Sequence, residues 1–175
     1  MYTTTNYFLS TWLISTMMTI LYPIISSSIA FSFLSFTDSS LQNYGQWLKI
    51  LLIQALSGAS FGFMIGSLVS SEITGLVINQ FVIIIFNFGS GIFINNKTAK
   101  PFVKLLVYTS PFRYACEAMM RCFLKDKANV EGIYDRFGYT LGSEKCVWAC
   151  VVFMVVFFIL SWISVEWKSR QLFKN

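Results

Sequence analysis

Long apolar runs separated by short polar breaks dominate this sequence. Four of them, at residues 7–36, 48–69, 73–94 and 146–165, reach the roughly 20 residues that a helix needs to cross a bilayer. The break between the second and third runs is only three residues long, which predicts a tight helical hairpin. Pro23, in the middle of the first run, predicts a kink. We therefore expect an all-α integral membrane protein with four transmembrane helices.

Residues 95–145, between the third and fourth runs, have a different pattern. Residues 101–107 form a short amphipathic stretch, with Lys100 and Lys104 on its polar side. A polar loop with three glycines is expected over residues 129–142.

A second short helix is predicted over residues 112–124. Ser110 and Pro111 are the residue types that favour an N-cap and a first helical position. Arg113 and Glu117 follow at a spacing of i, i+4, and the helix is apolar on one side. Because neither short helix can span a bilayer, we expect a re-entrant or interfacial helical pair before the last transmembrane helix.

The composition supports placement in a membrane. Of the 175 residues, 55% are hydrophobic, 12% are charged and none is histidine, whereas soluble domains carry roughly 25% charged residues. This excludes a soluble globular enzyme. The absence of histidine removes the usual general base and the commonest metal ligand.

The net charge of +5 does not indicate nucleic-acid binding. Nine of the thirteen basic residues lie between Lys97 and Lys145, together with five acidic ones. Mixed charge between apolar segments is typical of membrane-flanking loops and not of a phosphate-binding face. Counting Lys and Arg alone would place this loop on the cytoplasmic side.

The four cysteines and one sequon carry weaker signals. Cys116, Cys122, Cys146 and Cys150 contain no CxxC pair, so we expect free thiols in helices, with a disulfide between the loop and the last span as the alternative. Asn96 begins an Asn-Lys-Thr sequon. It lies at the membrane edge, where a glycan is hard to attach, so we expect it to be unmodified.

The second apolar run contains a ladder of glycines at every fourth position, namely Gly58, Gly62 and Gly66. Small residues at this spacing let another backbone approach closely. The ladder predicts helix packing, within the bundle or across a dimer. A glycine-lined passage is the alternative.

The third run carries amides in an otherwise apolar helix. Gln80, Ile84, Asn87 and Gly91 are spaced to share one helical face. Amides in a bilayer face protein or a water-filled cavity, so interhelical bonding and cavity lining are both open from the spacing alone. Glu72 begins this run, where the helix dipole favours an anion.

No sequence motif supplies chemistry. The chain has no GxxxxGK[ST] phosphate loop, GxSxG elbow or HExxH helix. We therefore expect no intrinsic enzymatic activity, no bound metal and no cofactor held by this chain.

The stretch from Ser110 to Ala118, SPFRYACEA, resembles a known family element. It is similar to the S-P-F-[KR]-Y-x-x-E-A element after the fifth membrane helix of subfamily G (the White type) of ATP-binding cassette transporters. Residues 89–95 resemble the end of that fifth helix, and residues 7–9 resemble the start of the third. The matching positions in the element are Ser110, Pro111, Phe112, Arg113, Tyr114, Glu117 and Ala118.

The resemblance implies that the four runs are helices three to six of a six-helix type-2 exporter domain. The first two helices, the coupling helix and the nucleotide-binding domain are absent from the chain. In this family the substrate cavity lies between two such domains, lined by helices two and five. By resemblance, Gln80, Ile84 and Asn87 fall on the cavity side of helix five, which favours cavity lining over interhelical bonding. Ile92 and Phe93 fall at the family's apolar plug.

The sequence departs from the family pattern in two places, and the charge of the long loop disagrees with the side of the membrane on which the family places it. The family's usual N-E-F is here Arg121-Cys122-Phe123, and the loop lacks the cysteines that some members bridge, so no disulfide is carried over. The family places the long loop outside, against the positive-charge count. We follow the family, which puts both termini in the cytoplasm of a plasma or internal membrane.

The expected function is that of the membrane-spanning part of an ATP-driven exporter of lipids, sterols or amphipathic small molecules. ATP and Mg would be held by a cassette domain outside this chain. The expected partners are the lipid bilayer, that nucleotide-binding domain, the remaining membrane helices and a second half-transporter in a homo- or heterodimer, but no nucleic acid. The chain would be a fragment of a larger transporter or a piece that assembles with others. A four-span scaffold of tetraspanin type and a small channel or carrier complete in itself are the alternatives.

Overall fold

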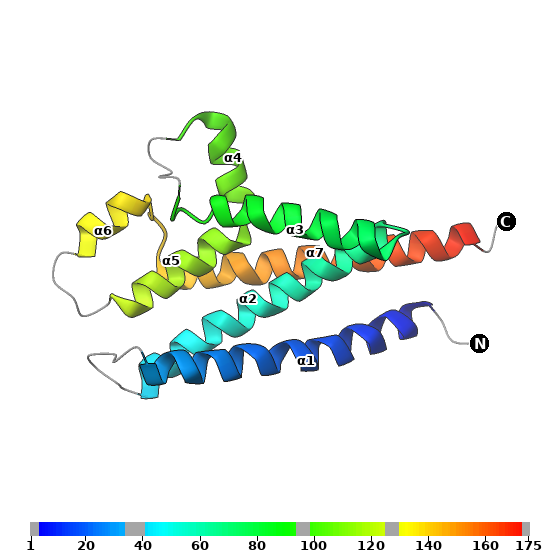
Figure 1. Cartoon of the computed structure of the whole chain (residues 1–175), viewed down its shortest axis with the longest axis horizontal. Coiled ribbons are helices and arrows are strands. Elements are labelled where there is room, and N and C mark those ends of the chain that lie inside the picture. The colour runs from blue at the N-terminus through cyan, green and yellow to red at the C-terminus, as the bar shows by residue number, and fades with distance from the viewer. Residues whose placement is uncertain (1–3, 34–40, 94–98, 125–129, 173–175) are drawn as a thin grey trace.

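The computed structural model describes residues 4–33, 41–93, 99–124 and 130–172. Helices make up nearly all of these ranges, which confirms the all-α class (Figure 1). The helices are α1 (Thr4–Phe33), α2 (Leu41–Leu68), α3 (Glu72–Phe88), α4 (Pro101–Thr109), α5 (Pro111–Phe123), α6 (Val130–Phe137) and α7 (Ser143–Leu172).

Three of the described helices are long and apolar enough to cross a membrane, namely α1, α2 and α7. They correspond to the predicted first, second and fourth spans. Their apolar segments have 30, 25 and 28 residues, so each helix is about 38–45 Å long. This exceeds the thickness of the hydrocarbon core of a bilayer, which is about 30 Å. The fourth transmembrane helix stays a prediction, because α3 has 17 residues and is about 25 Å long.

The predicted third span, residues 73–94, is longer than the helix that forms there. Helix α3 ends at Phe88, and the chain then turns through Gly89, Ser90 and Gly91. Gly91 has φ +89°, a conformation that only glycine adopts without strain. The spacing had suggested that Gly91 shares one helical face with the amides. That prediction is wrong, because Gly91 lies beyond the end of α3. Residue 94 lies outside the described ranges.

The core of the molecule is the contact between α2 and α7, which is the most extensive contact between described helices. Near one end, Ile50 of α2, Ala118 of α5 and Cys146 of α7 are buried together. Toward the other end, Phe61 and Phe157 pack with ring centroids 5.1 Å apart. The short helix α5 is thus part of the bundle, packed against both central helices.

Helix α1 packs along α2 and α7 through a few aromatic contacts. Phe8 is 4% exposed, and its ring centroid lies 5.5 Å from that of Phe158 and 6.4 Å from that of Phe63. The Thr4 and Ser169 hydroxyls are 2.9 Å apart. Most other apolar side chains of α1 remain exposed, as expected of a helix that faces lipid.

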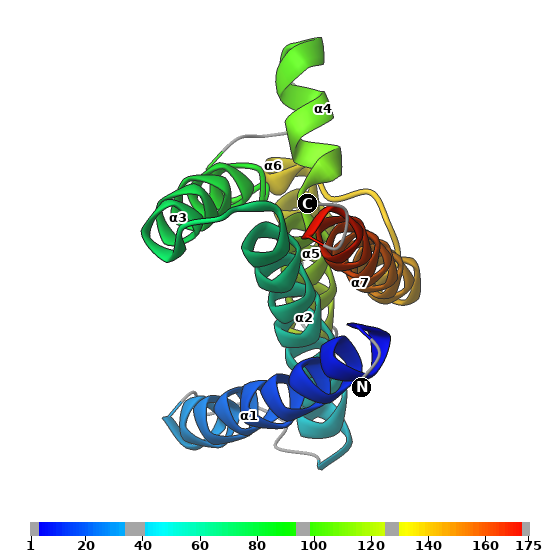
Figure 2. The same cartoon turned by 90° about the vertical axis from the view of Figure 1, so that its right-hand side faces the viewer.

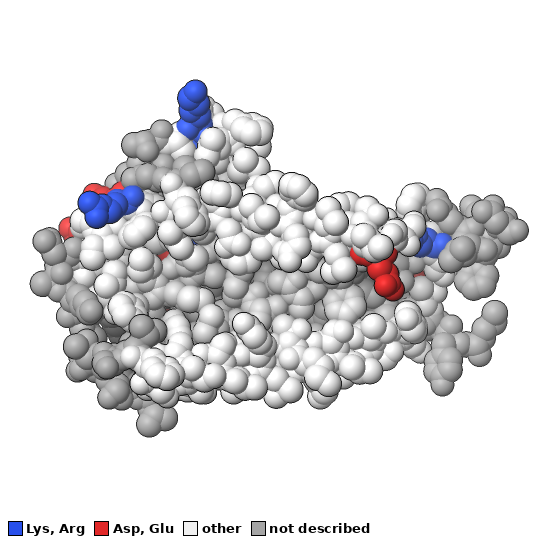
Figure 3. Space-filling model, in the orientation of Figure 1, with Lys and Arg blue, Asp and Glu red and all other residues white. Residues whose placement is uncertain are grey.

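The two ends of the bundle differ in character. The start of α1, the α2–α3 connection and the end of α7 lie at one end, and α5 and α6 lie toward the other (Figure 1). On the face shown in Figure 3, charged side chains gather toward the two ends and on α4, and the long middle has none. Helix α4 projects from the bundle (Figure 2), with Phe102 and Leu105 exposed.

The prediction of a polar loop over residues 129–142 is wrong in part, because helix α6 forms within this range. The guanidinium of Arg121 lies 4.4 Å from the ring centroid of Tyr134, which anchors α6 on the end of α5. Gly138, with φ +69°, ends the helix. Helix α6 is stabilised by a contact with Arg121, which lies outside the segment. The glycines within the segment therefore predicted a loop and gave no sign of this helix.

Candidate functional site

The polar face predicted for substrate lies on α3 and is uncovered. Gln80, Ile84 and Asn87 are all exposed, and Ile84 keeps 52% of its surface. The Asn87 side-chain N–H donates to the carbonyl of Ile83 at 3.0 Å, a bond within its own helix. The structure therefore gathers the three residues on one open face and shows no bond from Asn87 to another helix.

Ile92 and Phe93, the predicted plug, follow directly after the turn that ends α3. They are 53% and 68% exposed. The ring centroid of Phe93 lies 5.4 Å from that of Phe88, the last residue of α3. This pair thus extends the apolar surface of α3 beyond the helix, close to Asn87.

A contact from Tyr139, two residues beyond the end of α6, holds the turn in place, and sequence reasoning missed it. The Tyr139 hydroxyl donates to the carbonyl of Ser90 at 3.1 Å. A Cβ on Gly91 would lie 2.8 Å from the Tyr139 ring, so only glycine fits there. Tyr139 is 3% exposed, and desolvation raises the pKa of its hydroxyl, which favours the neutral form that donates this bond. Only the position of α6 brings Tyr139 to this turn.

The glycine ladder of α2 makes no close helix contact within the described chain. A Cβ added at Gly58, Gly62 or Gly66 would meet no atom within 4 Å. Close packing of another described helix against these three glycines is therefore not observed. Packing across a dimer stays a prediction, and Gly62 and Gly66 instead line a cavity.

The family element begins where the sequence predicted, but Ser110 acts differently. Pro111 is the first residue of α5, and Ser110 occupies the N-cap position without a side-chain capping bond. Its hydroxyl instead donates to the carbonyl of Phe86 at 2.8 Å. Gly89 permits this approach, since a Cβ there would lie 3.2 Å from the Ser110 Cβ. Ser110 therefore ties the end of α3 to the junction of α4 and α5.

The rest of the element lies along α5, and most of its side chains are turned inward. Pro111, Arg113, Ala115, Glu117 and Ala118 are buried. The Phe112 ring centroid lies 6.5 Å from that of Phe86 of α3, and the Tyr114 hydroxyl donates to the Tyr108 carbonyl at 3.0 Å. The element therefore docks α5 onto α3 and α4.

The two charged residues of the element are fully buried. Arg113 and Glu117 are both 0% exposed, although the sequence pattern had suggested an apolar side of α5 against the bundle. Arg113 donates to the carbonyl of Gly138 at 3.5 Å, and its guanidinium carbon lies 4.5 Å from the centre of the Tyr108 ring. The arginine thereby links α4, α5 and the end of α6.

Glu117 forms an ion pair with Arg121 across one turn of α5, with an N–O distance of 3.1 Å. Its second carboxylate oxygen has no hydrogen-bond partner among the described residues. Desolvation raises the pKa of Glu117, against the opposing effect of Arg121. The carboxyl therefore takes up a proton more readily than an exposed glutamate does.

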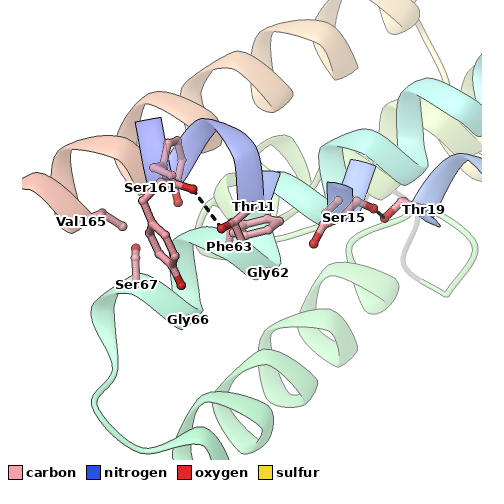
Figure 4. Close-up of a pocket in the computed structure, with 12 residues that line it drawn as sticks. Thr11, Ser15, Thr19, Gly62, Phe63, Gly66, Ser67, Ser161 and Val165 are labelled. Atoms are coloured by element: carbon pink, nitrogen blue, oxygen red, sulfur yellow. Dashed lines mark hydrogen bonds between the residues drawn. The ribbon is translucent and has the colours of Figure 1, made fainter. Parts of the chain in front are cut away.

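A cavity of about 540 Å³ opens between α1, α2 and α7 (Figure 4). Its wall includes Thr11, Ser15 and Thr19 of α1, which follow one another at intervals of four residues. Gly62 and Gly66 of α2 form another part of the wall, and Ser161 and Val165 of α7 contribute a third. The sequence analysis had noted the glycines but not the hydroxyl stripe facing them.

The described residues show no arrangement suited to a metal. No group of three histidine, cysteine, aspartate or glutamate side chains comes together within the described ranges. Cys116, Cys146 and Cys150 are free thiols in α5 and α7, in line with the expectation from their spacing. Asn96 lies outside the described residues.

Comparison with known proteins identifies a family and a relative. The family model described as ABC-2 type transporter matches residues 1–124. ABC transporter G family member 1 of Dictyostelium discoideum is 23% identical over 194 aligned residues, which cover 99% of this chain and 24% of that protein. The chain therefore spans about a quarter of the length of this relative.

Proposed function

The chain belongs to the ABC-2 type transporter family of membrane domains, and from this premise we propose that it forms helices three to six of a subfamily G exporter. Its family identity is that of the transmembrane part and not of the ATPase cassette. The cargo in this proposal is a lipid, a sterol or an amphipathic small molecule. Similarity along the whole chain to an ABC transporter of the G family supports the assignment to subfamily G.

The observation that carries the proposal is the open amide face of α3. Gln80 and Asn87 are exposed on a helix whose other exposed side chains, such as Phe81 and Ile85, are mostly apolar. Amides on an apolar helix need a polar partner or water. A cavity between two such domains, wetted on one side, supplies both. The amides then hold the polar part of a cargo molecule, and Ile84 contacts its apolar part.

ATP and Mg act elsewhere in this proposal. A cassette domain outside the chain binds and hydrolyses the nucleotide, and a second half-transporter completes the cavity. The open surfaces of α3 and of the α2 glycine ladder are the two candidate contact faces for the remaining helices and the second domain.

The test replaces Asn87 with leucine in the complete transporter that contains this chain. Asn87→Leu keeps the side-chain size but removes the amide, so we expect export of the cargo to fall about fivefold, as loss of one hydrogen bond predicts. The readout is ATP-dependent accumulation of a fluorescent lipid in the lumen of inside-out vesicles.

Ile85→Leu is the matched control, because Ile85 is exposed on the same helix at 44% but carries no polar group. It should export at the wild-type rate. Equal export by the Asn87→Leu and wild-type proteins contradicts the cavity assignment. Passage of the cargo or of ions without ATP contradicts the exporter as a whole.

A further inference from the structure

Residues 130–141, the cover segment, consist of α6 and the residues that follow it, and they shield the carboxyl of Glu117. Glu117 lies on α5 and is 0% exposed. The backbone N–H of Leu141 lies close to its carboxyl. Tyr134 and Tyr139 lie near enough to interact with it electrostatically. The cover segment therefore separates a buried acidic group from the solvent.

The cover segment is attached to the bundle through side chains. Among the described helices, none packs extensively against α6, which lies outside the bundle of long helices (Figure 1). Its attachments include three contacts, namely Arg121 with the Tyr134 ring, Arg113 with the Gly138 carbonyl, and Tyr139 with the Ser90 carbonyl. Both arginines lie one turn of α5 from Glu117. The cover segment can therefore lift without breaking the packing of the long helices.

The covered carboxyl is only half satisfied. Its Oε1 atom pairs with Arg121 at 3.1 Å, and its Oε2 atom has no hydrogen-bond partner among the described residues. An ionised oxygen without a partner is costly to bury. Two events relieve that cost. Either a proton from the solvent neutralises the carboxyl while the segment stays closed, or the segment lifts and water solvates the carboxylate.

The groups around the carboxyl leave it as the one that titrates. Of the described acidic residues, Glu117 alone is buried. The titratable groups that face it come from α5, α6, the loop after α6 and α7, namely Arg113, Arg121, Tyr134, Tyr139 and Cys146. Desolvation raises the pKa of Glu117, and the two arginines oppose this rise without reversing it. Desolvation also raises the pKa of both tyrosines, so they stay neutral where a glutamate titrates.

The other elements near α5 carry their charges away from this carboxyl. Lys49 of α2 and Glu144 and Lys145 of α7 are exposed. On α4, the Tyr108 ring lies under the guanidinium of Arg113. The charged residue of α3, Glu72, begins that helix, at the opposite end from the turn that Tyr139 holds.

We propose that Glu117 is a proton-binding site that controls the cover segment. With a proton from the solvent on Oε2, the carboxyl is neutral and the cover segment stays closed. When Glu117 loses this proton, the carboxylate draws in water and the cover segment opens more often. Because Tyr139 belongs to the cover segment, opening also releases the turn at Ser90, which precedes Ile92 and Phe93. The site lies on α5, so it does not depend on the proposed cargo face of α3.

The first test observes the proton directly, by infrared spectroscopy of the purified chain in detergent between pH 4 and pH 8. We expect a C=O band of a protonated carboxyl that persists to higher pH than the bands of exposed glutamates. Glu117→Gln should remove this band. Glu144→Gln is the matched control, because Glu144 is exposed and lies outside the cover segment, and it should leave the band unchanged.

The second test measures opening, by backbone hydrogen–deuterium exchange in peptides that cover residues 130–139 and 89–93. Glu117→Gln mimics the protonated carboxyl at every pH. At pH 8 both peptides of the wild type should exchange about fivefold faster than those of Glu117→Gln, as the cost of one unsatisfied buried group predicts. At pH 4 the two proteins should exchange alike. Glu144→Gln should follow the wild type at both pH values.

Three results overturn the proposal. One is equal exchange of the wild type and Glu117→Gln at pH 8. Another is faster exchange of Glu117→Gln than of the wild type at both pH values, which would make Glu117 only a structural partner of Arg121. The third is a pH response of residues 130–139 that residues 89–93 do not share. Because neither readout measures export, failure here leaves the α3 proposal intact, and failure of that proposal leaves this one intact.

Discussion

At the scale of single residues, the unusual feature is the amount of polar chemistry buried inside so apolar a molecule. Arg113 and Glu117 are 0% exposed on α5, and so are Ser57 and Ser60 on α2. A buried charge is costly unless it is paired, and here Arg121 pairs with Glu117 while Arg113 lies over Tyr108. The serines take little space, which lets the helices pack closely.

Replacement of Glu117 by glutamine should change how stability depends on pH. Because the pKa of Glu117 is raised in the folded chain, folding favours its protonated form. Its contribution to stability is therefore fully present below the pKa of the unfolded glutamate, about 4.3, and declines as pH rises toward the raised folded pKa. Glu117→Gln removes this decline. The measurement is the melting temperature in detergent between pH 4 and pH 8.

Glu131→Gln is the control for that experiment, because Glu131 is exposed on α6 and lies outside the buried cluster. Its melting temperatures should follow those of wild type at every pH. The prediction is contradicted if the melting temperature of the wild type rises with pH over this range and Glu117→Gln abolishes the rise. That result would mean that folding lowers the pKa of Glu117.

At the scale of elements, α3 is held mainly at its two ends. At one end it follows α2 after a short connection, where Lys168 of α7 donates to the Val69 carbonyl at 2.9 Å. At the other end, Ser110 and Tyr139 donate to the carbonyls of Phe86 and Ser90. Between these anchors most α3 side chains are exposed, so the amide face is positioned by contacts outside it.

Ser110→Ala should loosen α3 without altering α5 itself. The change removes the bond to the part-buried Phe86 carbonyl, at a cost of about 1 kcal/mol. Thr109→Ala is the matched control, because the Thr109 hydroxyl is exposed and donates within its own helix. Thermal unfolding in detergent should separate the two variants. Equal melting temperatures would show that this bond does not stabilise the fold.

The sequence allowed the ends of the long helices to be predicted to within seven residues, but not the details of the segment between α3 and α7. Runs of apolar residues determine α1, α2 and α7 because a bilayer imposes a minimum length on them. The end of α3 and the existence of α6 depend on Tyr139 and Arg121, which act from distant positions. For the same reason the α3 amides could be found from their spacing, whereas Ser161 and the cavity could not.

At the scale of the whole molecule, the described chain is a bundle with two different ends. The start of α1 and the end of α7 meet at one end, where Thr4 contacts Ser169, and the short helices cluster toward the other. Trp148 and Trp167 are exposed near the two ends of α7, at 69% and 61%, as is typical of residues at the membrane–water interface. This arrangement brings both ends of the described chain to one end of the bundle, and we predict that this end lies at one side of the membrane.

An epitope tag tests which side that is. We predict that a tag inserted at Thr140–Gly142 is detected on intact cells, because the short helices face outward in our proposal. Both residues are exposed, whereas Gly138 has φ +69° and accepts a bond from Arg113, so a tag there would disturb the fold. A tag after Asn175 is the control and should be stained only after permeabilisation. The reverse pattern would contradict the topology.

The pairing of α2 with α7 has a consequence for biosynthesis. Gln54 and Cys150, which contact each other across this pair, are 96 residues apart in the chain. At the usual speed of translation, about 5–20 residues per second, the ribosome needs roughly 5–20 s to deliver the second helix after the first. During that time α2 resides in the bilayer with its buried serines facing lipid or another protein. Until its last helix is made, the chain therefore lacks the most extensive contact between its described helices.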